Sequence, residues 1–165
     1  MPRRDLGEDG LAETPAYDLI ELFYFAYRDF VSDPDRILAE YGFGRAHHRV
    51  LHFVDRQPGL TIAELLDILR ITKQSLNRVL KELIEKDFVE SRTGTSDRRQ
   101  RLLYATSRGH DLALRLARLQ TRRIERALAA VDGNAKEVAT QYLLAMIDAD
   151  DRDHVEQIVF GGAKS

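Results

Sequence analysis

The chain has 165 residues, of which 44% are hydrophobic and 32% are charged. This is the composition of a soluble globular protein with one domain, or with one domain extended by helices. It contains no cysteine, which excludes disulfides, thiol redox sensing and cysteine-based zinc sites. No apolar run approaches the ~20 residues of a membrane span, and the charged start lacks the apolar segment of a secretion signal, so we expect a cytoplasmic protein.

The charge is unevenly distributed along the chain. The net charge is −2 and the pI is about 6.2, values that by themselves argue mildly against a nucleic-acid partner. From Thr72 to Arg101, however, eight Lys or Arg face five Asp or Glu, a local net charge of +3. A basic stretch on an acidic body is typical of a site-selective nucleic-acid binder.

The first predicted helix is apolar on nearly every side. Residues 1–15 form a mixed polar string that we expect to be a disordered tail. Tyr17 to Val31 then contains eleven apolar residues and only four polar ones. Such a helix must be covered on most sides, which predicts a dimer interface; the alternative is a helix of the internal core. The polar residues are Asp18, Glu21, Arg28 and Asp29.

Two further helices are expected before the basic stretch. Ser32-Asp33-Pro34-Asp35 ends the first helix, and Asp33 is the predicted N-cap of a short helix that begins with Pro34 and continues through Tyr41. Glycines at 42 and 44 separate it from a helix at Arg45–Arg56. Four apolar side chains of that helix are expected to face inward: Ala46, Val50, Phe53 and Val54.

The next two helices have the pattern of a helix-turn-helix. Thr61 and Glu64 form a capping box at the start of a short helix that ends at Leu69. After a tight turn, Thr72 is the predicted N-cap of a helix through Lys86, with apolar residues at 76, 79, 80, 83 and 84. Its other face carries cations and hydrogen-bond donors, as on a recognition helix that enters a major groove. The predicted DNA-binding residues of this helix are Thr72, Lys73, Gln74, Ser75, Asn77, Arg78 and Lys81.

A β-hairpin is expected directly after this helix. Phe88–Arg92 and Leu102–Thr106 are strand candidates, and the nine residues between them contain turn-forming Gly, Thr, Ser and Asp. Four arginines within ten residues suit the narrow, electronegative minor groove, although an isolated run of this kind is more often a solvated hairpin. These arginines are Arg92, Arg98, Arg99 and Arg101.

Two long helices are predicted in the last third of the chain, from His110 to about Val131 and from Lys136 to His154. They are too long to pack only on so small a module, which favours an intertwined dimer. The predicted fold is therefore mainly α with a small β-hairpin wing (α+β), a winged helix-turn-helix at 33–106. Residues 16–32 and 107–155 form its helical dimerisation region, and 156–165 a flexible tail.

Residues 76–109 resemble the signature of the MarR family of winged-helix transcriptional regulators. The resemblance is carried by Asn77–Leu83 on the helix, Lys86–Val89 entering the strand, Ser96–Arg99 at the wing tip and Thr106–Gly109 leaving it. It extends over roughly 17–155. One departure is Asp87, where the family commonly has Gly, but Asp tolerates a left-handed backbone better than most residues.

The resemblance implies a homodimer on a pseudo-palindromic operator of double-stranded DNA, usually acting as a repressor. It also implies that Arg99 enters the minor groove and that Asp97 orients it. Many relatives bind a small aromatic or anionic effector between the dimer helices and the DNA-binding lobe. Six residues are candidates to line such a crevice: Tyr24, Tyr27, Arg28, His47, His48 and His52.

Other functions have less support in the sequence. His48 and His52 lie one helical turn apart, as in a metal pair or a pH-sensitive site, but without a third ligand they are more often ordinary histidines, and we expect no metal or cofactor. No phosphate-binding glycine loop, nucleophile elbow or zinc-protease motif occurs, so an enzyme is not expected. The remaining alternative is a winged-helix protein-interaction module that binds no DNA.

Overall fold

The computed structural model describes residues 14–162, so the predicted tail at 1–15 lies almost wholly outside the described residues. Helices predominate, with one small antiparallel sheet, which confirms the predicted fold class. Within this range, no helix is both long enough and apolar enough to cross a bilayer. The elements are α1 (Tyr17–Ser32), α2 (Asp35–Ala39), α3 (Arg45–Arg56), β1 (Leu60–Thr61), α4 (Ile62–Leu69), α5 (Lys73–Glu85), β2 (Val89–Thr93), β3 (Arg101–Ala105), α6 (Ser107–Ala129), α7 (Ala135–Met146) and α8 (Ala149–Phe160).

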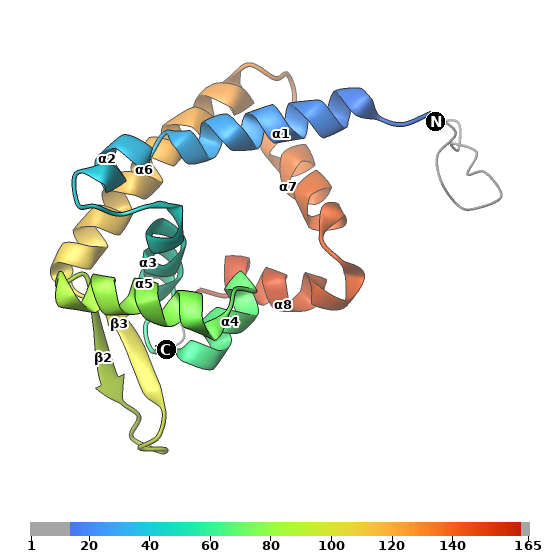
Figure 1. Cartoon of the computed structure of the whole chain (residues 1–165). Helices are drawn as coiled ribbons and strands as arrows, with labels where there is room; N and C mark the ends of the chain where they lie inside the picture. The colour runs from blue at the N-terminus through green and yellow to red at the C-terminus, as the bar shows by residue number, and fades with distance from the viewer. Residues whose placement is uncertain (1–13, 163–165) are drawn as a thin grey trace.

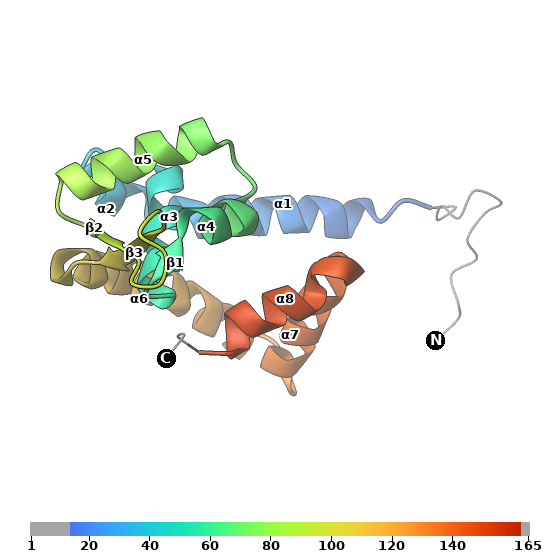
Figure 2. The same ribbon diagram turned by 90° about the horizontal axis from the view of Figure 1, so that it is seen from below.

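The helices surround the sheet unevenly. Figure 1 shows α1 along the upper edge with α6 crossing behind it, and the β2–β3 hairpin projecting below α5. From the end of α6, α7 and α8 lead back to the side of α4. Seen from below, α5 and α6 lie on opposite sides of α3 (Figure 2). The hairpin and α5 are therefore left accessible at the surface of the molecule.

Residues in the central part of the chain form the hydrophobic core. It is formed by α2 to α6 and the sheet, and includes Val50, Leu83, Phe88 and Leu116, each at most 1% exposed. Phe88 makes edge-to-face contacts with Phe43, with ring centroids 5.1 Å apart. By contrast, α1, α7 and α8 contain no buried residue. A single chain thus leaves its outer helices largely uncovered.

The helix-turn-helix has the predicted local signals. Thr61 accepts the backbone N–H of Glu64 at 3.2 Å, and the Glu64 carboxylate accepts the N–H of Thr61 at 2.9 Å, which confirms the capping box. Arg70 ends α4 in a left-handed conformation, with φ 51°. Thr72 is the N-cap of α5, as predicted.

The wing is built on a three-stranded sheet rather than on a hairpin alone. β2 and β3 pair antiparallel, with Ser91 opposite Leu103. On the other edge of β3, Leu60 pairs with Leu103 and Thr61 with Leu102. This short β1 was not predicted, because two residues carry no detectable period, and it joins the start of α4 to the base of the wing.

The turn from α5 into β2 depends on Asp87. Its φ is 65°, which confirms that Asp adopts the left-handed conformation expected at this position. The Asp87 carbonyl accepts a hydrogen bond from the Thr106 hydroxyl at 2.7 Å, and Thr106 also caps α6 through the N–H of Gly109. One threonine therefore ties the entry of the wing to its exit.

Three predictions near the helix ends and faces were wrong. Asp33 does not cap α2, whose N-cap is Pro34; its carboxylate instead accepts a hydrogen bond from Arg123 of α6 at 2.9 Å, and this guanidinium lowers the pKa of Asp33. The Asp33 carboxylate therefore pairs with Arg123 of α6 instead of capping α2. Ala46 is exposed rather than inward-facing, and the short second helix ends at Ala39 rather than Tyr41.

The predicted last helix at 136–154 is in fact two helices. Ile147 is extended, with ψ 139°, and ends α7. Asp150 and Asp151 then lie in the first turn of α8, where negative charge favours a helix N-terminus. Because α8 continues to Phe160, the expectation of a flexible tail from 156 is also wrong over these residues; 163–165 lie outside the described residues.

Candidate nucleic-acid interface

The recognition-helix candidate α5 is sharply two-sided. Leu76, Val79, Leu80 and Leu83 are buried in the core. The opposite face is exposed and carries Lys73, Gln74, Asn77, Arg78 and Lys81. The stripe of apolar residues at helical spacing fixes which side faces out, and it leaves the donor-rich side to solvent.

Most of these exposed side-chain donors have no partner among the described residues. The side chains of Lys73, Gln74, Asn77 and Arg78 make no hydrogen bond or ion pair within residues 14–162. The Lys81 ammonium lies 3.8 Å from the Glu85 carboxylate in an exposed pair. An exposed ion pair of this kind contributes little to the stability of the fold. This face can therefore bind a polar surface without breaking internal contacts.

Thr72 and Ser75, also predicted to bind DNA, are already engaged. The Thr72 hydroxyl accepts the Ser75 N–H at 3.1 Å and donates to the Ser75 hydroxyl at 2.9 Å. These two residues hold the first turn of α5 in shape. Their hydroxyls are less available to bases than the side chains of Gln74 and Asn77.

α5 is also held from the side by α3. The Nδ1 atom of His47 accepts the backbone N–H of Gly44 at 3.0 Å, so in the neutral ring Nε2 carries the proton. Nε2 lies 2.9 Å from a carboxylate oxygen of Glu82 and donates to it. Lys86 donates to the carbonyl of Tyr41 at 2.7 Å. These contacts fix the direction of α5 relative to the core.

The wing tip is shaped by Asp97. Its carboxylate accepts the backbone N–H of Arg99 at 2.9 Å, and the Gly94 N–H donates to the carbonyl of Gln100 at 2.9 Å. A Cβ atom at Gly94 would lie 2.6 Å from the Asp97 carbonyl oxygen, so the turn requires glycine. Asp97 thus positions the backbone from which Arg99 projects, rather than contacting the guanidinium.

The four wing arginines fall into two pairs. Where the strands meet the loop, Arg92 contacts Glu90 and lies over the Tyr104 ring, 4.2 Å from its centroid, while Arg101 donates to the Thr93 hydroxyl at 3.4 Å. At the tip, the side chains of Arg98 and Arg99 have no partner in the described part of the chain. Only the tip pair is uncommitted.

A pocket of about 400 Å³ lies between α1, α3 and α6. It brings together three of the six predicted effector residues, Tyr27, His48 and His52. The other three do not line it: His47 binds Glu82, Arg28 pairs with Asp29, and Tyr24 is exposed.

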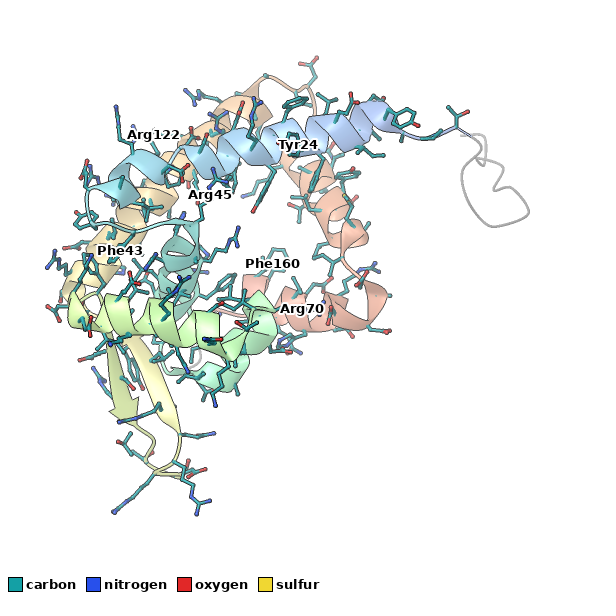
Figure 3. The ribbon with its side chains drawn as sticks, viewed as in Figure 1. Tyr24, Phe43, Arg45, Arg70, Arg122 and Phe160 are labelled. Atoms are coloured by element: carbon teal, nitrogen blue, oxygen red, sulfur yellow. The ribbon has the colours of Figure 1, made fainter. Side chains whose placement is uncertain are left out.

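Sequence reasoning missed two cations of this pocket, Arg45 and Arg49. They lie three residues before His48 and three before His52, so their spacing on one face of α3 was a usable signal. Figure 3 shows Arg45 beneath α1, at the start of α3. Arg49 donates to the Tyr27 hydroxyl at 3.1 Å and so links α3 to α1.

Both pocket histidines favour the neutral form. Burial is the main reason that the pKa of His48 is lowered to about 4, with smaller contributions from His52 and Arg49. Burial also lowers the pKa of His52, as does Arg56. Within residues 14–162 no group of three or more His, Cys, Asp or Glu is placed to hold a metal ion.

This predicts acid-sensitive stability. Because the pKa of His48 is lower in the folded protein than in the unfolded chain, this group first gains a proton in the unfolded chain as the pH falls below 6.5. We expect the free energy of unfolding to be unaffected by this group above 6.5 and to fall as the pH drops towards about 4. His48→Gln should flatten that dependence in urea titrations at several pH values. An equally steep decline in the variant would contradict the assignment.

Comparisons with known proteins agree with this geometry. The MarR family model matches residues 41–100. The HTH-type transcriptional regulator PetP of Rhodobacter capsulatus is 46% identical over 139 residues, 84% of each chain. Among solved structures, Streptococcus pneumoniae FabT in complex with DNA has a TM-score of 0.70 at 16% identity, over 80% of this chain and 94% of FabT. A MarR protein from Peptoclostridium difficile has a TM-score of 0.70 at 19% identity, over 87% and 94%. The structures share the fold, and the identity with PetP goes further: this chain belongs to the MarR family of transcriptional regulators, which are not enzymes.

Proposed function

We propose that the protein is a homodimer that binds a pseudo-palindromic site in double-stranded DNA and represses transcription. The observation that carries this proposal is the set of unpartnered donors on α5 together with the unpartnered guanidinium groups of Arg98 and Arg99. α5 enters a major groove, where Gln74, Asn77 and Arg78 contact base edges. The wing tip enters the neighbouring minor groove, whose negative potential attracts arginine.

The uncovered helices support a dimer. Eight large apolar or aromatic side chains of α1 are exposed, and α7 exposes Val138, Tyr142, Leu143 and Met146. Contiguous apolar surface of this kind marks a protein interface. With α1, α6 and α7 paired across a twofold axis, the two α5 helices would enter successive major grooves ~34 Å apart. The α1 residues are Tyr17, Leu19, Ile20, Leu22, Phe23, Tyr24, Phe25 and Tyr27.

The test is selection of bound sites from random DNA, followed by gel shifts at two salt concentrations. A symmetric consensus is expected, with half-sites about one helical turn apart. Binding should survive competitor DNA and weaken as salt rises, because phosphate contacts release counterions. Equal retention of random and selected sequences would contradict sequence-specific binding.

The wing assignment predicts a loss of affinity in Arg99→Ala. Removing one groove contact should weaken binding to the selected site by at least about 1 kcal/mol, or roughly fivefold. Arg36→Ala is the matched control, because Arg36 is an exposed arginine of α2 away from the wing. Unchanged affinity of intact Arg99→Ala dimers would remove the wing from the mechanism.

The pocket between α1, α3 and α6 supports regulation by a small aromatic anion. Arg45 and Arg49 supply positive charge, while Phe30, Val31 and Phe53 supply an apolar wall. A ligand that favours a different spacing of the DNA-binding lobes would shift the population away from the DNA-competent form. We expect a hydroxybenzoate to weaken operator binding in gel shifts and Arg49→Ala to abolish the effect. An identical response in Arg49→Ala would place the ligand elsewhere.

A further inference from the structure

The C-terminal helix α8 lies against the helix-turn-helix of its own chain. Asp151 near its start forms an ion pair with Arg70. Nε2 of His154 lies 3.2 Å from a carboxylate oxygen of Asp67 on α4. Further along, the side-chain amide of Gln57 donates to the carbonyl of Ile158 at 3.4 Å. Three polar contacts, spread over two turns of α8, thus hold it to the DNA-binding lobe.

The contacts between α8 and the DNA-binding lobe are weak enough to break and re-form. The side chain of Arg70 is 65% exposed and those of His154 and Asp67 are 55% and 69% exposed, and exposed ion pairs contribute little to stability. The apolar side chains at the end of α8, Val159 and Phe160, remain in solvent. A cavity of about 80 Å³ also remains between α8 and α4. No residue of α8 is fully buried, and Val155 and Ile158 are only half-buried, so α8 can leave α4 without unfolding either element.

Arg70 lies in the turn that leads into the proposed recognition helix α5. It lies in the turn between α4 and α5, two residues before the N-cap Thr72, and Figure 3 shows it facing α8 beside α4. The N-terminal end of a recognition helix is the end that enters the groove. With α5 in a major groove as proposed, a guanidinium at this turn would lie near the phosphates that flank the groove, next to the donors Lys73 and Gln74.

The charge of α8 is the reverse of what DNA binding requires. Its first turns carry Asp150, Asp151 and Asp153, directly after Asp148. Docked on α4, this acidic segment both neutralises Arg70 and places further negative charge beside the recognition helix. A carboxylate on Arg70 and a DNA phosphate on Arg70 are alternatives, because both take the same guanidinium.

We propose that Arg70 is an additional DNA-backbone contact and that the acidic start of α8 competes with DNA for it within the same chain. Docking of α8 then lowers DNA affinity, and DNA displaces α8 by the same factor, since the coupling between two binding events is reciprocal. Any partner that takes α8 away would raise the affinity for DNA. This inference rests on the proposed function of DNA binding.

A pair of isosteric substitutions separates the contact from the charge. Asp151→Asn removes the ion pair, whereas Asp153→Asn makes the same charge change at an exposed residue that has no partner in residues 14–162. We expect Asp151→Asn to bind the selected operator at least about threefold more tightly, the scale of one exposed ion pair. The slope of log affinity against log salt should steepen by about one. Asp153→Asn should change affinity less than Asp151→Asn.

The double variant provides the decisive comparison. In an Arg70→Ala background, Asp151→Asn should have no effect on affinity beyond that of Asp153→Asn, because the shared partner is gone. Equal gains from Asp151→Asn with and without Arg70 would overturn the inference while leaving DNA binding intact. Failure of the wild-type protein to bind any selected DNA would instead overturn the proposed function.

Displacement of α8 can be observed directly. The chain has no cysteine, so a single cysteine introduced at the exposed Glu156 carries a spin label without competing thiols. The label should become more mobile when operator DNA is added to the wild-type background. It should already be mobile without DNA when Asp151→Asn is also present. An unchanged spectrum on DNA binding would show that α8 stays docked and would overturn the inference.

Discussion

Replacing Ile20 and Leu22 together by glutamate is expected to separate the protomers and to lower operator affinity at least about hundredfold. The two side chains are 61% and 63% exposed, so the substitutions leave the core of the single chain intact. They lie on opposite sides of α1, and a partner that covers the helix must meet one of them. A dimer holds its second half-site at high effective concentration, and separated subunits lose that gain of 10²–10⁴.

Two measurements check this expectation. Sedimentation equilibrium should give dimers for the wild-type protein and single chains for the double variant at micromolar concentration. Arg36→Glu is the control, since it changes the net charge by the same amount at an exposed residue of α2. If the double variant stays dimeric, the interface lies elsewhere on the molecule and α1 is not its centre.

Gly109→Ala is expected to lower the free energy of unfolding by about 3 kcal/mol. Gly109 lies in the first turns of α6, and a Cβ there would be 1.9 Å from the carbonyl oxygen of Phe88. That oxygen is fixed, because it accepts the Thr106 N–H at 3.1 Å while Phe88 itself is buried. The higher helix propensity of alanine would by itself stabilise α6 by about 1 kcal/mol. The steric clash is larger, so the net change in the free energy of unfolding is a loss.

Urea denaturation with a matched glycine tests this directly. A Cβ at Gly44 would meet no atom within 4 Å, so Gly44→Ala should change stability by less than about 1 kcal/mol. Comparable losses in both variants would mean that the close approach of α6 to Phe88 does not constrain the fold.

The recognition helix and the wing were predictable because their signals are local. The apolar stripe of α5, the caps at Thr61 and Thr72 and the turn residues of the wing each lie within a few positions of one another. The left-handed turn at Asp87 was expected because the family commonly has Gly there and Asp tolerates this conformation. Interactions of short sequence separation leave a pattern in the sequence.

What the sequence did not reveal depends on distant partners. Asp33 has the form of an N-cap, and only the position of α6 shows that it binds Arg123 instead. The break at Ile147 is likewise explained by Arg152, whose guanidinium donates to the carbonyls of Leu144 and Ile147. Neither contact has a spacing or periodicity that a single sequence displays.

The candidate sites follow the same division. The donors of α5 and the tip arginines were found from the sequence, but their availability was not, because only the structure separates Arg98 and Arg99 from the engaged Arg92 and Arg101. His48 and His52, which share a face of α3 with Arg45, line the pocket together with Tyr27 of α1. The side chain of His47, one position before His48, instead contacts Glu82. One residue along a helix rotates a side chain by about 100°, enough to exchange one site for another.

The pairing of β3 on both edges has a mechanical consequence. Leu102 and Leu103 pair with β1 on one side and β2 on the other. The sheet therefore supports the hairpin up to these residues, and only the loop end lacks a third strand. We expect bending to be confined to the loop residues, so that the distance from the start of α4 to Arg99 stays nearly constant. If α5 and the wing enter neighbouring grooves as proposed, we expect the protein to tolerate little variation in the number of base pairs between those two grooves.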